Sequence, residues 1–302
     1  MGRMRRRLRR GDDAEETRLR CVEISNRHDI SFIILTWNSA ASIEHCLASI
    51  HAVAKSLNVM TCVIDNGSTD ETPAILQRAA ERFPEIALDI VWLSENRGTT
   101  ISRNIGIRHV ADRARYLCIL DSDAFVTAEA LRDMMRVLEE TPHAGIVGPV
   151  LQSEDGTVQN SGRAVPTLTL KLLKVLPIAS LRRRGEQMEE IEKPAGAVVP
   201  VGYLMSACWL MKSSLVQDIG LLDEHIFYAP EDVEYCLRAW TRGYRVLYDG
   251  RVAITHVWQR LSRKKLLSRH NWEHMKGLAY LFWKYCYCFR SRKFDRYRTQ
   301  GE

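Results

Sequence analysis

The sequence predicts an α/β protein built around a doubly wound, mostly parallel sheet. Through residues 29–150, short apolar runs alternate with stretches of helical periodicity, which is the pattern of successive βαβ units. Polar residues follow several of the apolar runs, at the strand ends where open α/β sheets place their ligands. The pattern changes after about residue 150, where we expect an α+β portion.

Each element of the first half follows from its local pattern. Residues 30–35 form an apolar run of strand length, and the next segment repeats apolar residues at Ile43, Leu47 and Ile50, the spacing of one helix face. The same alternation continues to residue 151. Strands are expected at 30–35, 59–64, 88–93, 116–120 and 145–151, and helices at 39–53, 73–83, 100–110 and 127–138.

The second half is less regular. The acidic turn sequence at 154–156 ends in Gly156 and predicts a hairpin. Residues 164–195 combine an apolar stretch with three consecutive arginines and are interpreted as a mobile lid. Further along, we expect a strand at 205–211, a helix at 230–241 and a strand at 245–248.

The charge is unevenly distributed along the 302 residues, whose formal net charge is +6. Residues 1–10 contain six arginines and no acid, and residues 260–302 contain twelve lysines and arginines against three acids, so the body between them is acidic. A nucleic-acid binder would place its positive charge on the folded face, which argues against that class of partner. Basic ends fit contact with an anionic membrane surface, or simply a disordered, solvated tail over residues 1–28.

The cysteines and apolar runs bear on the compartment. Eight cysteines are scattered without a C-x-x-C pair, which fits a reducing compartment. No apolar run reaches the ~18–20 residues of a spanning helix, and no signal peptide is expected. We therefore expect a cytoplasmic protein, or a peripheral one at the inner face of the plasma membrane. Residues 277–289 are apolar and aromatic between basic flanks, which fits a membrane-interfacial helix, a last helix on the core or a dimer contact. The oligomeric state stays open.

The triplet Asp121-Ser122-Asp123 is the most informative motif. It closes the expected strand at 116–120, and alternation of side chains along an extended strand would point both carboxylates the same way. Two hard oxygen ligands at the edge of a sheet suit Mg²⁺ or Mn²⁺, and such a cation suits a diphosphate. A surface turn explains an isolated D-x-D equally well.

Two other strand ends carry polar groups. Thr36-Trp37-Asn38 follows the first strand and Asp65-Asn66-Gly67-Ser68 follows the second. An ionised Asp65 can accept a hydrogen bond from the imide N–H of uracil or thymine, and Gly67 permits close approach of the backbone. Each segment alone also fits an ordinary turn. Their repetition after successive strands favours a shared site.

A helix start follows the third strand. Asn96 and Gly98 precede it and Arg103 lies within its first turns. Backbone N–H groups at such a start favour an anion, and Arg103 would contact a diphosphate or a base. The alternative is an arginine on the helix surface.

Two further positions in the second half fit catalysis. Glu231 and Asp232 open the expected helix at 230–241, where acids suit the helix dipole, but either carboxylate could accept a proton from an acceptor hydroxyl. His256 follows the last expected strand and is either structural or a ligand that completes a site with the acidic triplet.

These segments, in this order, resemble the inverting family 2 glycosyltransferases of the GT-A fold. The resemblance covers about residues 30–258, and the set of motifs is specific although each motif alone is weak. The matching segments are 34–38, 63–70, 95–98, 121–123, 220–224 and 231–238, closed by His256.

The resemblance implies a role for each matched residue. Asp121 would lie near the ribose or the metal, Asp123 would bind the metal with His256, and Asp232 would be the catalytic base, with Glu231 as the alternative. The nucleotide would be held by Thr36, Trp37, Asn38, Asp65, Asn96, Gly98, Arg103 and Asp121.

The resemblance also implies the substrates. The most similar subgroup is that of bacterial transferases of cell-surface polysaccharides, including rhamnosyl- and galactofuranosyltransferases. A UDP- or dTDP-sugar donor, a Mg²⁺ or Mn²⁺ cofactor, and a glycan or polyprenyl-linked acceptor bordered by Trp209 would follow. Many rhamnosyl relatives read Asn-x-Gly-Phe-Ala after the third strand, whereas residues 96–100 here read Asn-Arg-Gly-Thr-Thr, so the donor sugar stays open.

Two other functions remain as alternatives. A sugar-nucleotide nucleotidyltransferase shares the sheet and the acidic metal site, but it usually needs a Gly-rich basic loop after its first strand. A non-catalytic nucleotide or glycan binder would not need all of the acidic residues. The family assignment divides the chain into a basic tail (1–28), a nucleotide-sugar-binding half (29–150), an acceptor-side and catalytic half (151–259) and a basic aromatic tail (260–302).

Overall fold

The computed structural model describes residues 28–257, 269–289, 291 and 294. Its strands are β1 (His28–Thr36), β2 (Val59–Asp65), β3 (Ala87–Trp92), β4 (Ala114–Asp121), β5 (Ala124–Phe125), β6 (Ala144–Gln152), β7 (Val158–Gln159), β8 (Gly162–Arg163), β9 (Val198–Pro200), β10 (Tyr203–Leu204), β11 (Cys208–Lys212) and β12 (Arg245–His256). Its helices are α2 (Ile43–Ala54), α3 (Thr72–Arg82), α4 (Thr99–Val110), α5 (Ala128–Glu140), α6 (Leu168–Val175), α7 (Ala179–Glu189), α8 (Ser213–Ile219), α9 (Glu231–Thr241) and α10 (Arg269–Lys284).

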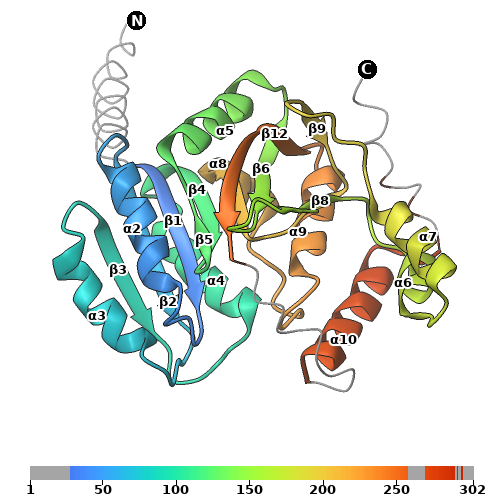
Figure 1. Cartoon of the computed structure of the whole chain (residues 1–302), viewed down its shortest axis with the longest axis horizontal. Coiled ribbons are helices and arrows are strands. Elements are labelled where there is room, and N and C mark those ends of the chain that lie inside the picture. Colours follow the sequence, from blue (N-terminus) through green and yellow to red (C-terminus); the bar gives the residue numbers. More distant parts are fainter. Residues whose placement is uncertain (1–27, 258–268, 290, 292–293, 295–302) are drawn as a thin grey trace, which may run out of the picture.

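One ten-stranded sheet dominates the described residues, with helices on both faces (Figure 1). Its main order is β3-β2-β1-β4-β11-β6-β12-β5. Strands β1 to β4 run parallel, and β11 enters antiparallel between β4 and β6. Buried residues of α2, α3 and α5 cover one face, and those of α4, α8 and α9 cover the other. The predicted doubly wound, mostly parallel sheet is confirmed.

The register of the parallel strands brings the polar strand ends together. Thr36 at the end of β1 lies opposite Asp65 at the end of β2. On the other side of β1, Leu35 lies opposite Asp121 at the end of β4. Because parallel strands finish at the same edge, three polar segments that are far apart in sequence meet there.

Strand β12 brings the last site residue to the same edge. It runs parallel to β6 and pairs antiparallel with the short β5, which places His256 opposite Ala124. The N–H of Val257 also donates to the carbonyl oxygen of Asp123, at 2.9 Å. His256 is thus the last residue of a long strand, whereas the sequence predicted a strand ending at residue 248.

Residues 164–195, interpreted from the sequence as a mobile lid, contain the two helices α6 and α7. Thr167 caps α6 by accepting a hydrogen bond from the N–H of Leu170. The carboxyl end of α7 is buried at Glu189, which the three-arginine run did not predict.

Helix α10 packs on the protein through one face. Leu278, Leu281 and Tyr285 are buried in the core, and Lys284 bonds to Asp223 and Glu234. This confirms that residues 277–289 include a last helix on the core. The rest of the 260–302 tail lies largely outside the described residues, as does the predicted disordered tail apart from His28. Within the described ranges, no helix is long and apolar enough to cross a membrane.

Candidate active site

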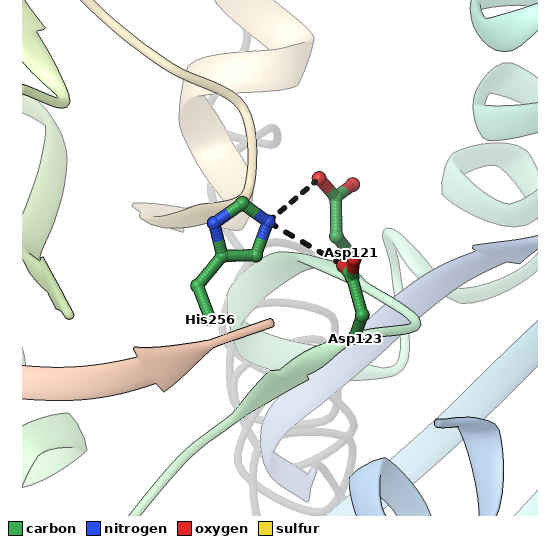
Figure 2. Close-up of side chains that lie close together, drawn as sticks. All are labelled: Asp121, Asp123 and His256. Atoms are coloured by element: carbon green, nitrogen blue, oxygen red, sulfur yellow. Dashed lines mark ion pairs between the residues drawn. The ribbon is translucent and has the colours of Figure 1, made fainter. Parts of the chain in front are cut away.

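Asp121, Asp123 and His256 form a cluster at the carboxyl end of β4 (Figure 2). His256 Nε2 lies 3.4 Å from Asp123 Oδ1 and 4.0 Å from Asp121 Oδ2, and the candidate ligand atoms all lie within 4.8 Å of one another. Ligands held about 2.1 Å from an octahedral Mg²⁺ lie roughly 3.0 to 4.2 Å apart. The cluster therefore fits a divalent cation after a small inward movement, and its imidazole suits Mn²⁺.

Gln159 fixes the orientation of the His256 ring. The side-chain amide of Gln159 donates to the carbonyl oxygen of His256 at 2.8 Å, which turns the Gln159 Oε1 atom toward His256 Nδ1 at 2.7 Å. A carbonyl oxygen can only accept, so Nδ1 carries a proton. In the neutral ring, Nε2 then presents its lone pair to the two carboxylates, as a metal ligand requires.

The charges within the cluster oppose one another. Burial tends to lower the pKa of His256, but the Asp123 and Asp121 carboxylates outweigh burial and raise it. Burial, together with the Asp123 charge, raises the pKa of Asp121 although Arg103 and His256 act against the rise. Two carboxylates so close together repel, and a bound cation relieves this repulsion.

Arg103 joins the metal cluster to the start of α9. Its side chain is buried, with Nη2 2.7 Å from Asp121 Oδ1 and Nη1 3.2 Å from Glu231 Oε1. The Ser206 hydroxyl lies 2.8 Å from the same Nη1. One guanidinium therefore holds together segments that lie more than 100 residues apart, and the two acidic motifs belong to one site.

Glu231 and Asp232 differ in their surroundings. Glu231 is buried and contacts Arg103 and Ser206, whereas Asp232 is only half-buried and accepts from the N–H of Val233 at 2.8 Å. Burial and the adjacent Asp232 raise the pKa of Glu231 to about 8. Burial also raises the pKa of Asp232. Asp232 is thus the more accessible of the two carboxylates, and Glu231 positions Arg103.

The loops after β1, β2 and β3 interlock through amide and hydroxyl groups. Asn38 Oδ1 accepts from the N–H of Thr69 at 2.8 Å, and Asn66 Oδ1 accepts from the N–H of Arg97 and from Ser102, both at 2.9 Å. Asn96 accepts from Asn66 at 3.1 Å. These bonds fix the strand ends that the sequence had singled out.

The residues expected to hold the nucleotide differ in exposure. Thr36 and Asp65 are almost fully buried, and Asp65 accepts a 2.5 Å hydrogen bond from the Ser68 hydroxyl. Trp37 is 44% exposed beside them. Of these three residues, Trp37 is the one with an open side chain, and the Asp65 carboxylate is bonded to Ser68.

The start of α4 is occupied by the protein itself. The Thr99 N–H donates to the carbonyl oxygen of Phe227 at 2.7 Å, and Gly98 is buried against the Phe227 ring. Thr100 donates to the carbonyl oxygen of Ile226 at 2.5 Å. The expectation of an anion on this helix start is therefore wrong for the N–H of Thr99, because the loop before α9 has taken its place.

The comparisons with known proteins agree with this geometry. The model of "Glycosyl transferase family 2" matches residues 31–217, more than half of the chain. The chain belongs to this family. An N-acetylglucosaminyl-diphospho-decaprenol L-rhamnosyltransferase of Mycobacterium tuberculosis is 26% identical over 239 residues, covering 74% of each protein. The hexosyltransferase Agl10 of Haloferax volcanii, from low-salt glycan biosynthesis, is 25% identical and covers 70% of this chain and 61% of its own length.

Solved structures place this family 2 glycosyltransferase in the GT-A fold. The mannosyltransferase PcManGT of Pyrobaculum calidifontis, solved with GDP-Man and Mn²⁺, superposes with a TM-score of 0.59 at 21% identity, over 86% of this chain and 64% of that one. GalNAc-T7, solved with UDP, GalNAc and Mn²⁺, gives 0.58 at 13% identity, over 81% and 46% of the two chains. At these identities the likeness shows the fold alone.

Trp209 of the glycosyltransferase lies in the core and not at an acceptor site. Trp209 was expected to border the acceptor, but its side chain is 0% exposed and stacks on Tyr235 with ring centroids 5.9 Å apart. Position 209 lies on β11 at the centre of the sheet, where both faces are covered. Its large apolar ring is core material, and the aromatic identity alone did not distinguish the two roles.

The sequence missed other residues of the site. Gln159 and Ser206 stand in segments without a motif, so no local signal identified them. Asn66 belonged to a recognised motif but was not chosen. Tyr228, which is 41% exposed, lies close enough to Glu231, Asp121 and Asp232 for their charges, with burial, to raise its pKa. Its position two residues before Pro230 was the only available indication.

Proposed function

We propose that this glycosyltransferase moves a sugar from a nucleotide-sugar to a hydroxyl of a lipid-linked glycan, with a divalent metal and with inversion at the anomeric carbon. The observation that carries the proposal is the contact of Arg103 with both Asp121 of the Asp121–Asp123–His256 cluster and Glu231, the neighbour of the half-buried Asp232. One edge of the sheet thus offers a diphosphate site and a base.

The donor is proposed to bind across the carboxyl edge of the sheet. Asp65 accepts the imide N–H of the base, and Thr36, Trp37, Asn38 and Asn96 line the nucleoside. A UDP- or dTDP-sugar is favoured because Asp65 is an acceptor that pairs with an imide donor. The M. tuberculosis relative, named as an L-rhamnosyltransferase, supports a deoxyhexose among the candidate sugars.

The metal is proposed to be held by Asp121, Asp123 and His256. When bound there, Mg²⁺ or Mn²⁺ would neutralise the charge that grows on the leaving diphosphate. Gln159 keeps His256 in the required tautomer, and Arg103 orients the Asp121 carboxylate. These two residues fix the site before any ligand arrives, which is the form of electrostatic stabilisation that needs no reorganisation during reaction.

Asp232 is proposed to be the base. The acceptor oxygen attacks the anomeric carbon as its proton passes to Asp232, and the bond between that carbon and the diphosphate oxygen breaks. The nucleoside diphosphate leaves from the opposite face, so one displacement inverts the centre. Proton transfer to a positioned carboxylate is typically worth about 10²–10⁴-fold in rate.

The acceptor is proposed to be a polyprenyl-diphosphate-linked glycan, and the enzyme is proposed to work as a peripheral protein at the cytoplasmic membrane face. The printed name of the M. tuberculosis relative contains such an acceptor. Exposed Trp272, Met275 and Trp283 on α10 support contact with a lipid surface.

The decisive experiment screens nucleotide-sugars for thermal stabilisation with Mn²⁺, Mg²⁺ or EDTA. A donor should raise Tm only with metal, and Asp123→Ala should abolish the rise, since ligands stabilise the state that they bind. Incubation of that donor should release a nucleoside diphosphate. Release of pyrophosphate from a nucleoside triphosphate and a sugar phosphate would instead indicate a nucleotidyltransferase, and binding without any turnover would indicate a non-catalytic binder.

A further inference from the structure

Three cations surround one buried carboxylate beside the candidate active site. Glu189, whose side chain is 6% exposed, lies 3.7 Å from Arg163 Nη1 and 3.9 Å from Lys171 Nζ, and it bonds to Lys174. The Tyr203 hydroxyl lies 3.4 Å from the same carboxylate. Glu189 can balance only one of the three positive charges. A surplus of positive charge therefore stands here, on side chains that are one-quarter to one-third exposed.

This cation cluster, formed by Arg163, Lys171 and Lys174, acts on the proposed base. Burial raises the pKa of Asp232, and the charges of Arg163 and Lys171 counteract that rise. Salt largely screens exposed charges that are separated by more than a Debye length, ~10 Å, so cations that influence Asp232 lie near it. The cluster comes from β8 and α6, outside the strand ends that hold the metal residues. Arg163 contacts Met205, and the adjacent Ser206 bonds to Glu231, so the cluster approaches the start of α9 from elements other than those of the metal residues.

An exposed apolar surface begins on the same helix. On α6 and the turn that follows, the exposed apolar side chains are Leu172, Val175, Leu176 and Ile178. Helix α10 lies next to α6 (Figure 1), and the chain after α10 joins it where the Leu168 N–H donates to the carbonyl oxygen of Cys288 at 2.8 Å.

The outward face of α10 is also largely apolar, although Lys276 lies on it above the Trp272 ring. Trp272, Met275, Ala279 and Trp283 are all exposed and recur at spacings of three or four residues, which places them on one side of the helix. The opposite side is buried on the core. Large exposed apolar patches beside a charged site mark contact with an apolar partner.

We propose that Arg163, Lys171 and Lys174 bind the diphosphate of the acceptor, whose hydrocarbon chain lies along the exposed apolar face of α6 and α10. This inference rests on the proposed function, because the diphosphate is joined to the acceptor sugar whose hydroxyl Asp232 is proposed to deprotonate. An arginine fork and two ammonium groups are the donors that proteins use for phosphate. A flat bilayer headgroup would not reach cations that are mostly buried, whereas a single extracted lipid diphosphate does.

The test uses farnesyl diphosphate, inorganic pyrophosphate and farnesol as probes, with the full-length protein in EDTA. Binding is measured by calorimetry with detergent present. The farnesyl diphosphate concentration is kept below the level at which this lipid forms micelles. Farnesyl diphosphate should bind most tightly of the three. Lys171→Met should weaken it by on the order of tenfold or more, the loss expected for one charged hydrogen bond, and Lys171→Arg should restore it. Lys171 is chosen because it is the cation farthest from Glu189.

Controls separate this site from others. Lys55→Met removes an exposed lysine directly after α2, on the far side of the molecule from α6 (Figure 1), and should leave binding unchanged. Asp123→Ala should also leave binding unchanged, because EDTA already prevents metal-dependent binding at the donor site. Tm values of each variant confirm that the fold persists.

Several results would overturn the inference. Equal affinity for pyrophosphate would show a site for free diphosphate, and equal affinity for farnesol would show that the cations do nothing. An equal loss of farnesyl diphosphate affinity in Lys55→Met would show non-specific charge attraction. A loss of affinity in Asp123→Ala would place the ligand in the donor site. None of these measurements uses a nucleotide-sugar. Failure of the donor screen would therefore refute the proposed function independently of these results.

Discussion

Substituting Gly98 by alanine should impair turnover by moving the loop that carries the catalytic acids. Gly98 has a φ of +83°, and a Cβ atom built on it would lie 2.3 Å from the carbonyl oxygen of Phe227 and 2.7 Å from the Phe227 ring. The same loop runs on through Pro230 to Asp232. Because the Thr99 N–H also donates to Phe227, the clash cannot be relieved without disturbing that contact.

The size of the effect follows from these distances. Ordinary van der Waals contact begins at 3.4 Å, so Phe227 must retreat by about 1 Å. The backbone at Gly98, with φ +83° and ψ 177°, lies in a region that is essentially restricted to glycine and adds about 1–3 kcal/mol of strain for a residue with a Cβ. A displacement of about 1 Å in a catalytic group costs on the order of 10²-fold in rate. We therefore expect kcat to fall by about 100-fold in Gly98→Ala.

Gly156→Ala provides the matched control. Gly156 has a φ of +81°, nearly the same as Gly98, but a Cβ atom built there meets nothing within 4 Å among the described residues. The control therefore replaces another positive-φ glycine without introducing the clash. Urea unfolding should show about 1–2 kcal/mol lost in Gly156→Ala and more in Gly98→Ala. Steady-state kinetics should show normal turnover in the control.

Donor affinity distinguishes two roles for Gly98. If Gly98 positions the loop, kcat falls while the Kd for the nucleotide-sugar with Mn²⁺ stays near its original value. If Gly98 lies against the nucleotide, as the family resemblance implied, donor affinity falls as well. Equal stability and equal kcat in the two alanine variants would refute the argument from the Phe227 contact.

Four further predictions follow from the site and its supports. Asp232→Asn should lower kcat by about 10²–10⁴-fold with donor binding intact, and near-normal turnover would move the base elsewhere. The acid limb of the kcat profile should lie at higher pH than that of an ordinary aspartate, because burial raises the pKa of Asp232 and only its ionised form accepts a proton; an acid limb within the ordinary range of aspartate would contradict this. Gln159→Leu should weaken Mn²⁺ binding by about 10–100-fold in a calorimetric titration, since His256 loses its tautomer control, and unchanged affinity would remove His256 from the ligand set. Lys284→Met should lower the free energy of unfolding by about 1.5–3 kcal/mol in urea titrations, because the buried carboxylates of Asp223 and Glu234 lose the ammonium group that they share, and a change below about 0.5 kcal/mol would show that α10 packs by its apolar face alone.

The parallel half of the fold was predictable because its signals are local. A buried strand such as residues 59–65 is mostly apolar, and each strand is separated from the next by one helix of the right period. The strand ends could be located for the same reason, and with them Asp65, Asp121 and Asp123. The second half was harder to predict. Strand β11 inserts antiparallel into the sheet, and β12 continues past residue 248 through a bulge that the periodicity of the sequence does not indicate.

Errors at single residues had a common cause, which is that a side chain's role depends on what lies across from it. Trp209 and Trp37 are both tryptophans near a strand end, yet one is in the core and the other is 44% exposed. Gly98 precedes helix α4, and nothing in the sequence indicated that the first N–H group of this helix has a partner. In the fold, that N–H group, on Thr99, donates to the carbonyl oxygen of Phe227.

The amino-acid order by itself determined the alternating βαβ framework, the polar edge and the family, since these depend on neighbours within one strand, one turn or one helix. Only the tertiary structure decided that Arg103 ties Asp121 to Glu231, that Gln159 orients His256, and that three cations gather at Glu189. These contacts join segments tens to more than one hundred residues apart, and their energies depend on burial and distance, which a linear sequence does not contain.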